Sequence, residues 1–209
     1  KGAYDFISKP FKTDVLLLTI ERALTESRLK HENESLRKLS PYAMLDDLVG
    51  KSSAIAEVRR AVEKVAQTDS RVLISGPPGS GKGAIARMLH SRSLRKNGRF
   101  VVLTCATLSE DTLEQALFGI EATKSHPRRI GVLEEAHGGT LLLDEVADMD
   151  MATQLKMVRV LHNRRFQRIG GDTVVEVNSR VLATTTRDLQ ALIAEGKFRE
   201  DLFYRLNVV

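Results

Sequence analysis

The glycine-rich segment GPPGSGKG at residues 76–83 constrains the fold more than any other part of this sequence. It follows a short apolar run, VLIS at 72–75, and precedes the helical stretch AIARMLH at 84–90. A strand, a glycine-rich loop with a lysine and then a helix form the arrangement that a phosphate-binding P-loop requires. Such a loop stands at the end of a buried strand, so we expect an α/β fold around a parallel sheet.

The residue types in this loop suit the phosphate chain of a nucleotide. The glycines let successive backbone N–H groups turn inward at the positive end of the following helix, and Lys82 reaches the β and γ phosphates. A solvent-exposed glycine-rich turn is the simpler alternative, but it does not need the lysine. We therefore expect ATP or ADP to bind at Gly76, Pro77, Pro78, Gly79, Ser80, Gly81, Lys82, Gly83 and Ala84.

Further apolar runs after the loop complete the predicted fold. FVVLTC (100–105), LLLD (141–144) and VLATT (181–185) are unbroken, as expected of strands buried on both faces of a parallel sheet. Amphipathic stretches separate them. The pattern predicts a three-layer α/β/α sandwich. One insertion, FQRIGGDTVVEV at 166–177, predicts a β-hairpin that turns at Gly170, Gly171 and Asp172.

Two acidic residues, the last residue of the run LLLD and the one after it, supply the chemistry that the P-loop lacks. An Asp at the carboxyl end of a neighbouring strand can hold Mg²⁺, and an adjacent Glu can orient and deprotonate the attacking water. Asp144 and Glu145 fit these roles, which match the Walker B motif, and Gly83 leaves the metal dependent on Asp144. A solvated strand end is the alternative, and the nearby P-loop weighs against it.

Two arginines near the end of the sequence, Arg199 and Arg205, have two interpretations. Arginines far from their own P-loop can stabilise the γ-phosphate of a neighbouring subunit, as arginine fingers do. The residues alone favour a surface salt bridge with Glu200 or Asp201 instead.

Composition excludes several classes of protein. No window approaches the roughly 18 apolar residues of a membrane span, and no export signal is recognisable, so we expect a cytoplasmic protein. Cys105 is the single cysteine, which excludes an internal disulfide and any multi-cysteine metal site, and we expect it to be a small buried residue. A net charge of +5 permits contact with nucleic acid but does not indicate it.

Several blocks together resemble the AAA+ domain of NtrC-type sigma-54 activators of bacteria. These blocks are LVGKSSAI (48–55), GPPGSGKG (76–83), LFG (117–119), GGTLLLDE (138–145), LKMVRVL (155–161), FQRIGG (166–171), VLATTTRDL (181–189) and FREDLFYRLNV (198–208). The resemblance implies that Val49 and Gly50 approach the adenine and that Thr185 is the sensor I residue. It also implies that Arg199 and Arg205 are fingers acting across a ring of subunits.

The first residues resemble another domain of the same regulators. GAYDFISKPF is similar to the end of a response-regulator receiver, with Lys9 as its phosphate-sensing lysine and Phe6 as its switch aromatic. We therefore divide the chain into a receiver remnant (1–12), the last receiver helix with a linker helix (13–40) and an AAA+ domain (41–209). The apolar stripe of the helix fits either a single packed helix or a dimerising one. The AAA+ lid and the DNA-binding domain are expected outside this sequence.

The sequence departs from the family at the parts that couple ATP to mechanical work. The family's GAFTGA loop, which grips the sigma factor, is replaced by the shorter segment IEATKSHPRRIGVLEEAH. Thr104 replaces the Asn that restrains the catalytic glutamate, Thr186 replaces the Asn after sensor I, and Gly83 replaces a Glu. Regulators of the NtrX-type branch also lack the GAFTGA loop, and this chain is most similar to that branch.

These observations predict an ATP-binding and ATP-hydrolysing two-component response regulator that controls transcription through AAA+ oligomerisation. Its expected partners are further copies of itself, as a dimer through receiver and linker and as a ring through AAA+, a sensor histidine kinase and promoter DNA. Sigma-54 polymerase is not expected as an ordinary partner. The alternative is a nucleotide-switched DNA-binding scaffold or repressor with little ATPase activity. A clamp loader or unfoldase is disfavoured, because neither has a place for the receiver tail.

Overall fold

The computed structural model describes residues 19–21, 23–25, 27, 50, 52–122 and 127–209. Contacts divide the chain into two compact units, Lys1–Met44 and Leu45–Val209. The described residues of the first unit are helical, and the Thr25 hydroxyl donates to the Glu21 carbonyl at 2.8 Å. The expected receiver remnant, with Phe6 and Lys9, lies outside the described residues.

The second unit alternates strands and helices, as predicted. Its sheet strands are β1 (Val72–Ser75), β2 (Phe100–Thr104), β5 (Thr140–Asp144) and β8 (Arg180–Thr185), and its short strands are β3 (Gly119–Ile120), β4 (Arg129–Ile130), β6 (Arg165–Gln167) and β7 (Val174–Glu176). Its helices are α2 (Ser53–Ala66), α3 (Lys82–Ser91), α4 (Glu110–Phe118), α5 (Val132–Glu135), α6 (Met151–Asn163), α7 (Leu189–Ala194) and α8 (Glu200–Leu206). Two 3₁₀ turns, η1 (Cys105–Thr107) and η2 (Val146–Asp148), follow β2 and β5.

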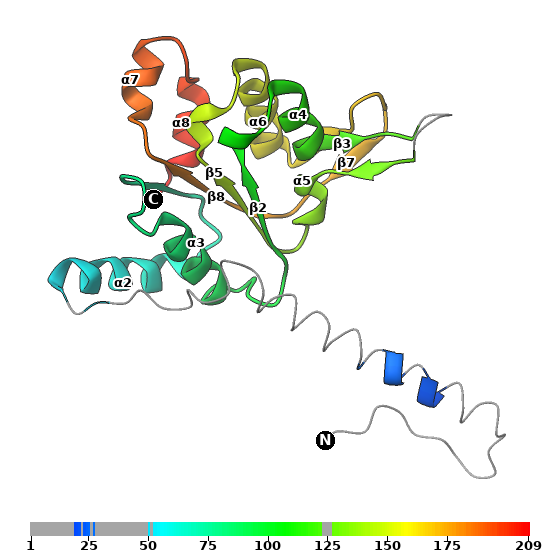
Figure 1. Cartoon of the computed structure of the whole chain (residues 1–209), viewed down its shortest axis with the longest axis horizontal. Helices are drawn as coiled ribbons and strands as arrows, with labels where there is room; N and C mark the ends of the chain where they lie inside the picture. Colours follow the sequence, from blue (N-terminus) through cyan, green and yellow to red (C-terminus); the bar gives the residue numbers. More distant parts are fainter. Residues whose placement is uncertain (1–18, 22, 26, 28–49, 51, 123–126) are drawn as a thin grey trace. The chain divides into compact units, whose positions relative to one another are not determined.

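The four sheet strands are parallel and lie in the order β1-β8-β5-β2 (Figure 1). Each was predicted as a strand, although β2 ends at Thr104, one residue earlier than expected, because Cys105 begins η1. The carboxyl ends of parallel strands meet at one edge of a sheet. Ser75 pairs with Thr185 and Thr104 with Asp144, so the end of the P-loop strand and the Walker B aspartate share this edge.

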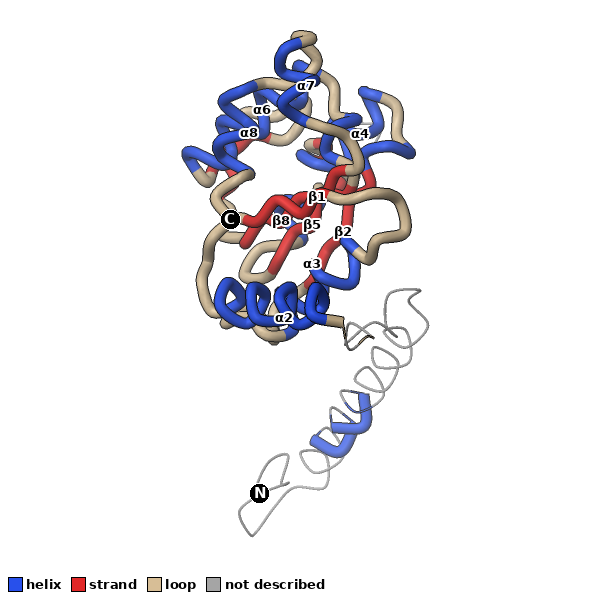
Figure 2. Tube along the Cα trace, turned by 90° about the vertical axis from the view of Figure 1, so that its left-hand side faces the viewer, coloured by secondary structure: helices blue, strands red, loops and turns tan. Residues whose placement is uncertain are grey.

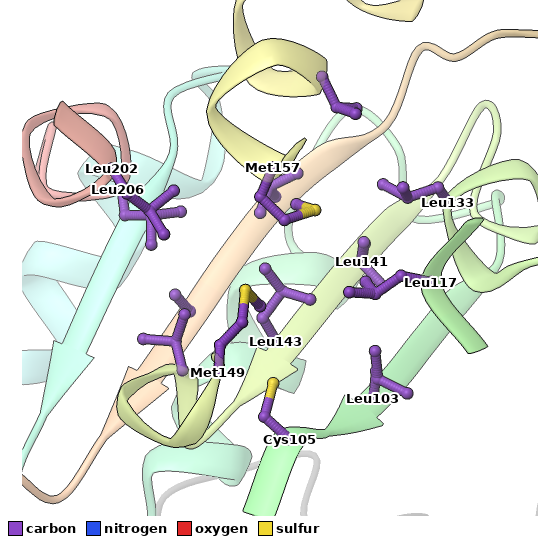
Figure 3. Packing of buried hydrophobic residues seen from close by; sticks show 14 of the residues in the cluster. Leu103, Cys105, Leu117, Leu133, Leu141, Leu143, Met149, Met157, Leu202 and Leu206 are labelled. Carbon is purple, nitrogen blue, oxygen red and sulfur yellow. The ribbon is translucent and has the colours of Figure 1, made fainter. Parts of the chain in front are cut away.

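Helices cover both faces of the sheet, as the expected three layers require. Alternate residues of a strand point to opposite faces. Leu142 and Leu182 pack with α2 and α3 on one face, whereas Leu141 and Leu143 pack with α4, α6 and α8 on the other. Figure 2 shows α2 and α3 apart from the other helices, and Figure 3 shows Leu141, Leu143 and Met157 within the second cluster. Cys105 belongs to this cluster at 1% exposure, and burial raises the pKa of its thiol to about 12.

Two small hairpins depart from this layered arrangement. β6 pairs antiparallel with β7, which confirms the predicted hairpin, although the paired part is shorter than 166–177 and the connection spans 168–173. β3 pairs antiparallel with β4, and this hairpin was not predicted. The Glu121 N–H donates to the Ile169 carbonyl and the Ile169 N–H to the Gly119 carbonyl, both at 3.0 Å, so the two hairpins are joined.

No helix within the described part of the chain is long and apolar enough to cross a membrane.

Candidate nucleotide-binding site

The P-loop occupies the turn between β1 and α3. Gly79 and Gly81 have φ values of 76° and 89°, in the left-handed region that glycine enters without a steric penalty. Gly81 is the N-cap of α3, so the first N–H groups of this helix point into the loop. Pro77, Pro78, Gly79 and Ser80 are exposed. An exposed loop at the positive end of a ten-residue helix is a ready site for phosphate oxygens.

The ammonium group of Lys82 lies inside this loop. It donates to the carbonyls of Gly76 at 3.0 Å and Pro77 at 3.3 Å, and it lies 3.4 Å from the Glu145 carboxylate. Lys82 is buried, at 7% exposure, so these oxygens replace the water that a cation otherwise needs. The lysine is thereby held in the loop before any phosphate arrives.

Of the two Walker B residues, Asp144 is the last residue of β5 and Glu145 follows it. β5 lies beside β8. Asp144 accepts a hydrogen bond from the Thr184 hydroxyl at 2.6 Å, and the Glu145 N–H donates to the same hydroxyl at 3.0 Å. Glu145 has a φ of 55°, which is uncommon for a residue with a side chain. This turn brings its carboxylate back toward Lys82.

Thr186 holds the other oxygen of the Glu145 carboxylate. Its N–H and its hydroxyl both donate to Glu145 Oε2 at 2.8 Å, while Oε1 faces Lys82. Hydrogen bonds to a carboxylate are among the stronger ones in proteins. Thr184 was not singled out from the sequence, and Thr186 was noted only as the replacement of a family Asn, although residues two apart along an extended chain share a face.

Thr185 and Thr104 are placed differently from their neighbours. Thr185 ends β8, which lies between the two Walker strands, but its hydroxyl donates to the Arg187 carbonyl and accepts the Arg187 N–H. Thr185 is 1% exposed, and the hydrogen bonds to the Walker B acids come from its neighbours. Thr104 ends β2 opposite Asp144, and its carbonyl accepts a hydrogen bond from the Thr107 hydroxyl at 3.3 Å.

The two arginines expected as fingers lie at opposite ends of α8. Arg199 is its N-cap and makes a bidentate pair with Asp201 at 3.0 and 2.8 Å, so the salt-bridge alternative is present within one chain. This pair raises the pKa of Arg199, but both side chains are partly exposed. Arg205 lies in the last turn and makes no ion pair with another described residue. Neither arginine contacts the P-loop of its own chain.

The residues expected beside the adenine are described only in part. Gly50 has a φ of 147°, and its carbonyl accepts from Arg59 at 3.0 Å. A Cβ at Gly50 would lie 2.3 Å from Cδ1 at the tip of the Ile55 side chain, which would have to move, and the positive φ is itself strained for a larger residue. Val49 lies outside the described residues.

A magnesium ion fits the donor set at this edge of the sheet. Among the described residues, no group of three or more His, Cys, Asp or Glu side chains could hold a metal ion. Mg²⁺ in phosphate sites needs less, because it takes one or two carboxylates together with substrate phosphates and water. Asp144 lies at the carboxyl end of β5, one strand away from the P-loop strand β1, and can supply such a carboxylate.

Comparison with known proteins agrees with this geometry. Residues 48–209 match the family model of the Sigma-54 interaction domain. The chain is 49% identical over 210 residues to the nitrogen assimilation regulatory protein NtrX of Azorhizobium caulinodans, and it covers 45% of that protein. Crystal structures of NtrX from Brucella abortus in complex with ADP and with ATP align at 50% identity with TM-scores of 0.85 and 0.84. Both alignments cover 100% of this chain and 46% of the crystallised one.

The chain thus spans about half the length of the relatives that it matches. Within that span the agreement extends over the P-loop, the Walker B acids and the α8 segment, all of which fall in residues 48–209. Because the family model matches residues 48–209, most of the chain, the chain belongs to the family of the AAA+ Sigma-54 interaction domain.

Proposed function

We propose that this chain binds ATP with Mg²⁺ and hydrolyses it slowly, as the AAA+ part of a two-component transcription regulator. The observation that carries the proposal is the meeting of Lys82 and Glu145, 3.4 Å apart, at the carboxyl edge of the sheet. The lysine comes from the P-loop and the glutamate from the Walker B strand. The relative from Brucella abortus, with crystal structures containing ATP and ADP, supports the same ligand.

The residues of the site divide the chemistry among them. Lys82 exchanges the Gly76 and Pro77 carbonyls for phosphate oxygens when the nucleotide binds, and the N–H groups at the start of α3 bind the remaining oxygens. Asp144 would hold a Mg²⁺ ion, which would supply positive charge against the phosphate chain. Glu145 then loses Lys82 as a partner and accepts a proton from the attacking water, while Thr186 keeps the carboxylate oriented.

We propose that hydrolysis needs a second subunit. Arg199 and Arg205 do not reach the P-loop of their own chain, and they act on the nucleotide of a neighbour as the family's fingers do, with Thr185 as the sensor I residue. The exposed pair of Arg199 with Asp201 is worth little and can open on assembly. Receiver phosphorylation by a sensor histidine kinase controls this assembly, and promoter DNA is bound by a domain outside this sequence.

A second candidate, a nucleotide-switched DNA-binding scaffold, is favoured by one specific observation. Glu145 is engaged by Lys82 and twice by Thr186, so its carboxylate is occupied by donors instead of being open to water. If these bonds persist with ATP bound, nucleotide sets the oligomeric state without turnover. This candidate also fits the replacement of the GAFTGA loop.

Steady-state ATPase activity of the intact protein, measured against protein concentration with and without receiver phosphorylation, separates the two candidates. The proposed ATPase gives turnover that rises with concentration. Glu145→Gln should keep ATP bound and lower turnover by roughly 10² to 10⁴, the usual range for general base catalysis. Lys82→Ala should abolish binding. Wild-type protein that binds ATP but shows no turnover at any concentration establishes the scaffold instead.

A further inference from the structure

A second polar cavity lies at the end of the sheet opposite the P-loop. It has a volume of about 410 Å³, within the usual range for sites of small ligands. Ser70 and Arg71 line it just before β1, and Ser179 lines it just before β8. These residues precede the strands whose other ends carry the nucleotide site. The cavity is therefore separate from that site.

The polar groups that line this cavity are mainly donors. Arg71 and Arg164 contribute guanidinium groups, and Ser70 and Ser179 contribute hydroxyls that hydrogen-bond no other described residue. The cavity wall is otherwise apolar, with Leu133, Val160, Leu161, Val177, Val181 and Val208. A lining of hydrogen-bond donors and apolar side chains is the composition expected for a site that binds a small organic molecule with an anionic group.

The cavity carries more positive than negative charge, because one carboxylate faces several arginines. The only carboxylate in the lining, Asp69, accepts two hydrogen bonds from Arg95, at 2.7 and 2.6 Å. Arg71 donates only to the Leu161 carbonyl, at 3.4 Å, and Arg164 has no ion pair among the described residues. Burial and the nearby Arg205 and Arg164 lower the pKa of Arg71, so these three cations repel one another.

A fourth arginine lies beneath the cavity. Arg180 is 2% exposed, and its guanidinium donates only to the main-chain carbonyls of Ser70, Ala66 and Val65. Buried arginines are normally matched by carboxylates. Here the nearest one, Asp69, is already bound to Arg95. An anion in the cavity would add negative charge close to these arginines.

We propose that this cavity is a phosphate-binding site, with Arg71, Arg164, Ser70 and Ser179 as its donors. Guanidinium groups recognise phosphate oxygens in a bidentate manner, and hydroxyls complete such sites. The phosphate has two possible sources, a free phosphorylated solute or the nucleotide carried by a second copy of this chain. Both ligands present phosphate oxygens to the same donors, and the two arms of the experiment distinguish them.

The first arm titrates inorganic phosphate into the Lys82→Ala protein, in which the P-loop no longer competes, and follows binding by calorimetry. Arg71→Gln and Arg164→Gly in that background should each weaken affinity about tenfold. Arg60→Gln removes the same charge at an exposed position of α2 and should leave phosphate affinity unchanged. Arg164 has a φ of 56° as the C-cap of α6, so glycine suits its backbone and the variant stays folded.

The second arm measures association of the same variants with ATP-loaded Glu145→Gln protein, by light scattering. Phosphate binding that depends on Arg71 and Arg164 supports the site with a free solute as its ligand. Association that depends on them, without phosphate binding, supports the site with a second copy's nucleotide. If Arg71→Gln and Arg164→Gly match Arg60→Gln in both arms, the proposal is overturned. ATP affinity at an intact P-loop, measured separately, tests the proposed function independently.

Discussion

At the residue scale, three consecutive threonines at the end of β8 have two different tasks. Thr184 and Thr186 face the Walker B acids and bond Asp144 and Glu145, whereas Thr185 faces away and closes the turn at Arg187. This alternation follows from the two-residue period of a strand. A hydroxyl at each position is therefore used, and the three residues are not interchangeable.

The Thr186 hydroxyl should position Glu145 for water activation. Thr186→Val keeps the shape of the side chain and the backbone N–H but removes one of the two hydrogen bonds to Oε2. We expect kcat for ATP hydrolysis to fall about tenfold, the cost of one hydrogen bond to a charged group, with little change in KM. Steady-state kinetics at fixed protein concentration measures both quantities.

Thr186→Ser restores the hydroxyl and should restore kcat, which a merely structural role for the threonine methyl would not do. An unchanged or raised kcat in Thr186→Val would contradict positioning and show that this bond restrains Glu145 instead.

Contiguous motifs explain why part of the site could be predicted from the sequence. Residues 76–83 carry every element of a P-loop in one segment, and Asp144 with Glu145 directly ends an apolar run. The contacts of Thr184 and Thr186 depend on β8 lying beside β5. The order of strands in the sheet cannot be predicted from a local sequence pattern. The bidentate pair of Arg199 with Asp201, two positions apart, was within reach of local reasoning.

At the element scale, the sheet was predictable because its strands are buried on both faces and therefore appear as continuous apolar runs. The β3–β4 hairpin was not, since each strand has only two residues. It forms because Gly119 and Gly131 allow close backbone contact: a Cβ at Gly131 would lie 2.3 Å from the Leu117 carbonyl. Packing of this kind leaves no periodicity in the sequence.

Arg168 joins the two small hairpins through a network of ion pairs in which the arginine itself is buried. Its guanidinium donates to Glu134 of α5 at 2.9 to 3.0 Å and to Glu121 after β3 at 2.9 Å, and Arg168 is 7% exposed. Arg128 pairs with Glu134 as well. These charged hydrogen bonds raise the pKa of Arg168 against the desolvation that burial imposes.

Arg168→Gln should destabilise the protein, because it leaves two carboxylates without their shared cation. We expect the melting temperature to fall by about 5 °C. Arg165→Gln is the matched control in the same hairpin, since Arg165 pairs with Glu176 through side chains that are 62% and 68% exposed. The control should shift the melting temperature by no more than about 1 °C. Equal shifts in the two variants would show that the network contributes nothing beyond surface charge.

The segment 120–129 should not support ordinary sigma-54 promoter opening. It contains no Phe, Tyr or Trp, whereas the resemblance to sigma-54 activators implies a loop here that contacts the sigma factor through Phe and Thr. Full-length protein with sigma-54 polymerase and hydrolysable ATP should give no open complex above background, measured by permanganate footprinting. ATP-dependent melting would show that another element, such as the connection at 168–173, makes this contact.

At the scale of the whole molecule, the sequence predicts parts more readily than their assembly. The P-loop and Walker B acids predict an ATPase core, but Arg199, one of the arginines expected to act on a neighbour, is paired with Asp201 of its own chain. Surfaces that pack only between subunits are not buried within one chain, so no burial pattern in the sequence predicts them. Oligomerisation is therefore a question for solution measurements.

The helix expected at 13–40 should hold two copies together. Within its described residues, Ile20 and Leu24 are four positions apart on one helical face and are 46% and 65% exposed, which leaves an apolar stripe open to a partner helix. Leu29 and Leu36 lie seven positions apart and share a second apolar face of the expected helix. Paired polar substitutions, Leu29→Gln with Leu36→Gln, should convert the dimer into a monomer, because a coiled-coil seam loses its buried leucines.

Light scattering of the intact protein measures this change. The control is Lys30→Gln with Arg37→Gln, which has the same seven-residue spacing but lies about 100° around a helix from Leu29 and Leu36. An unchanged dimer mass in the leucine variant, with helix content retained by circular dichroism, would move the contact to the receiver. A monomer that still hydrolyses ATP in a concentration-dependent way would show that the AAA+ ring assembles without the linker.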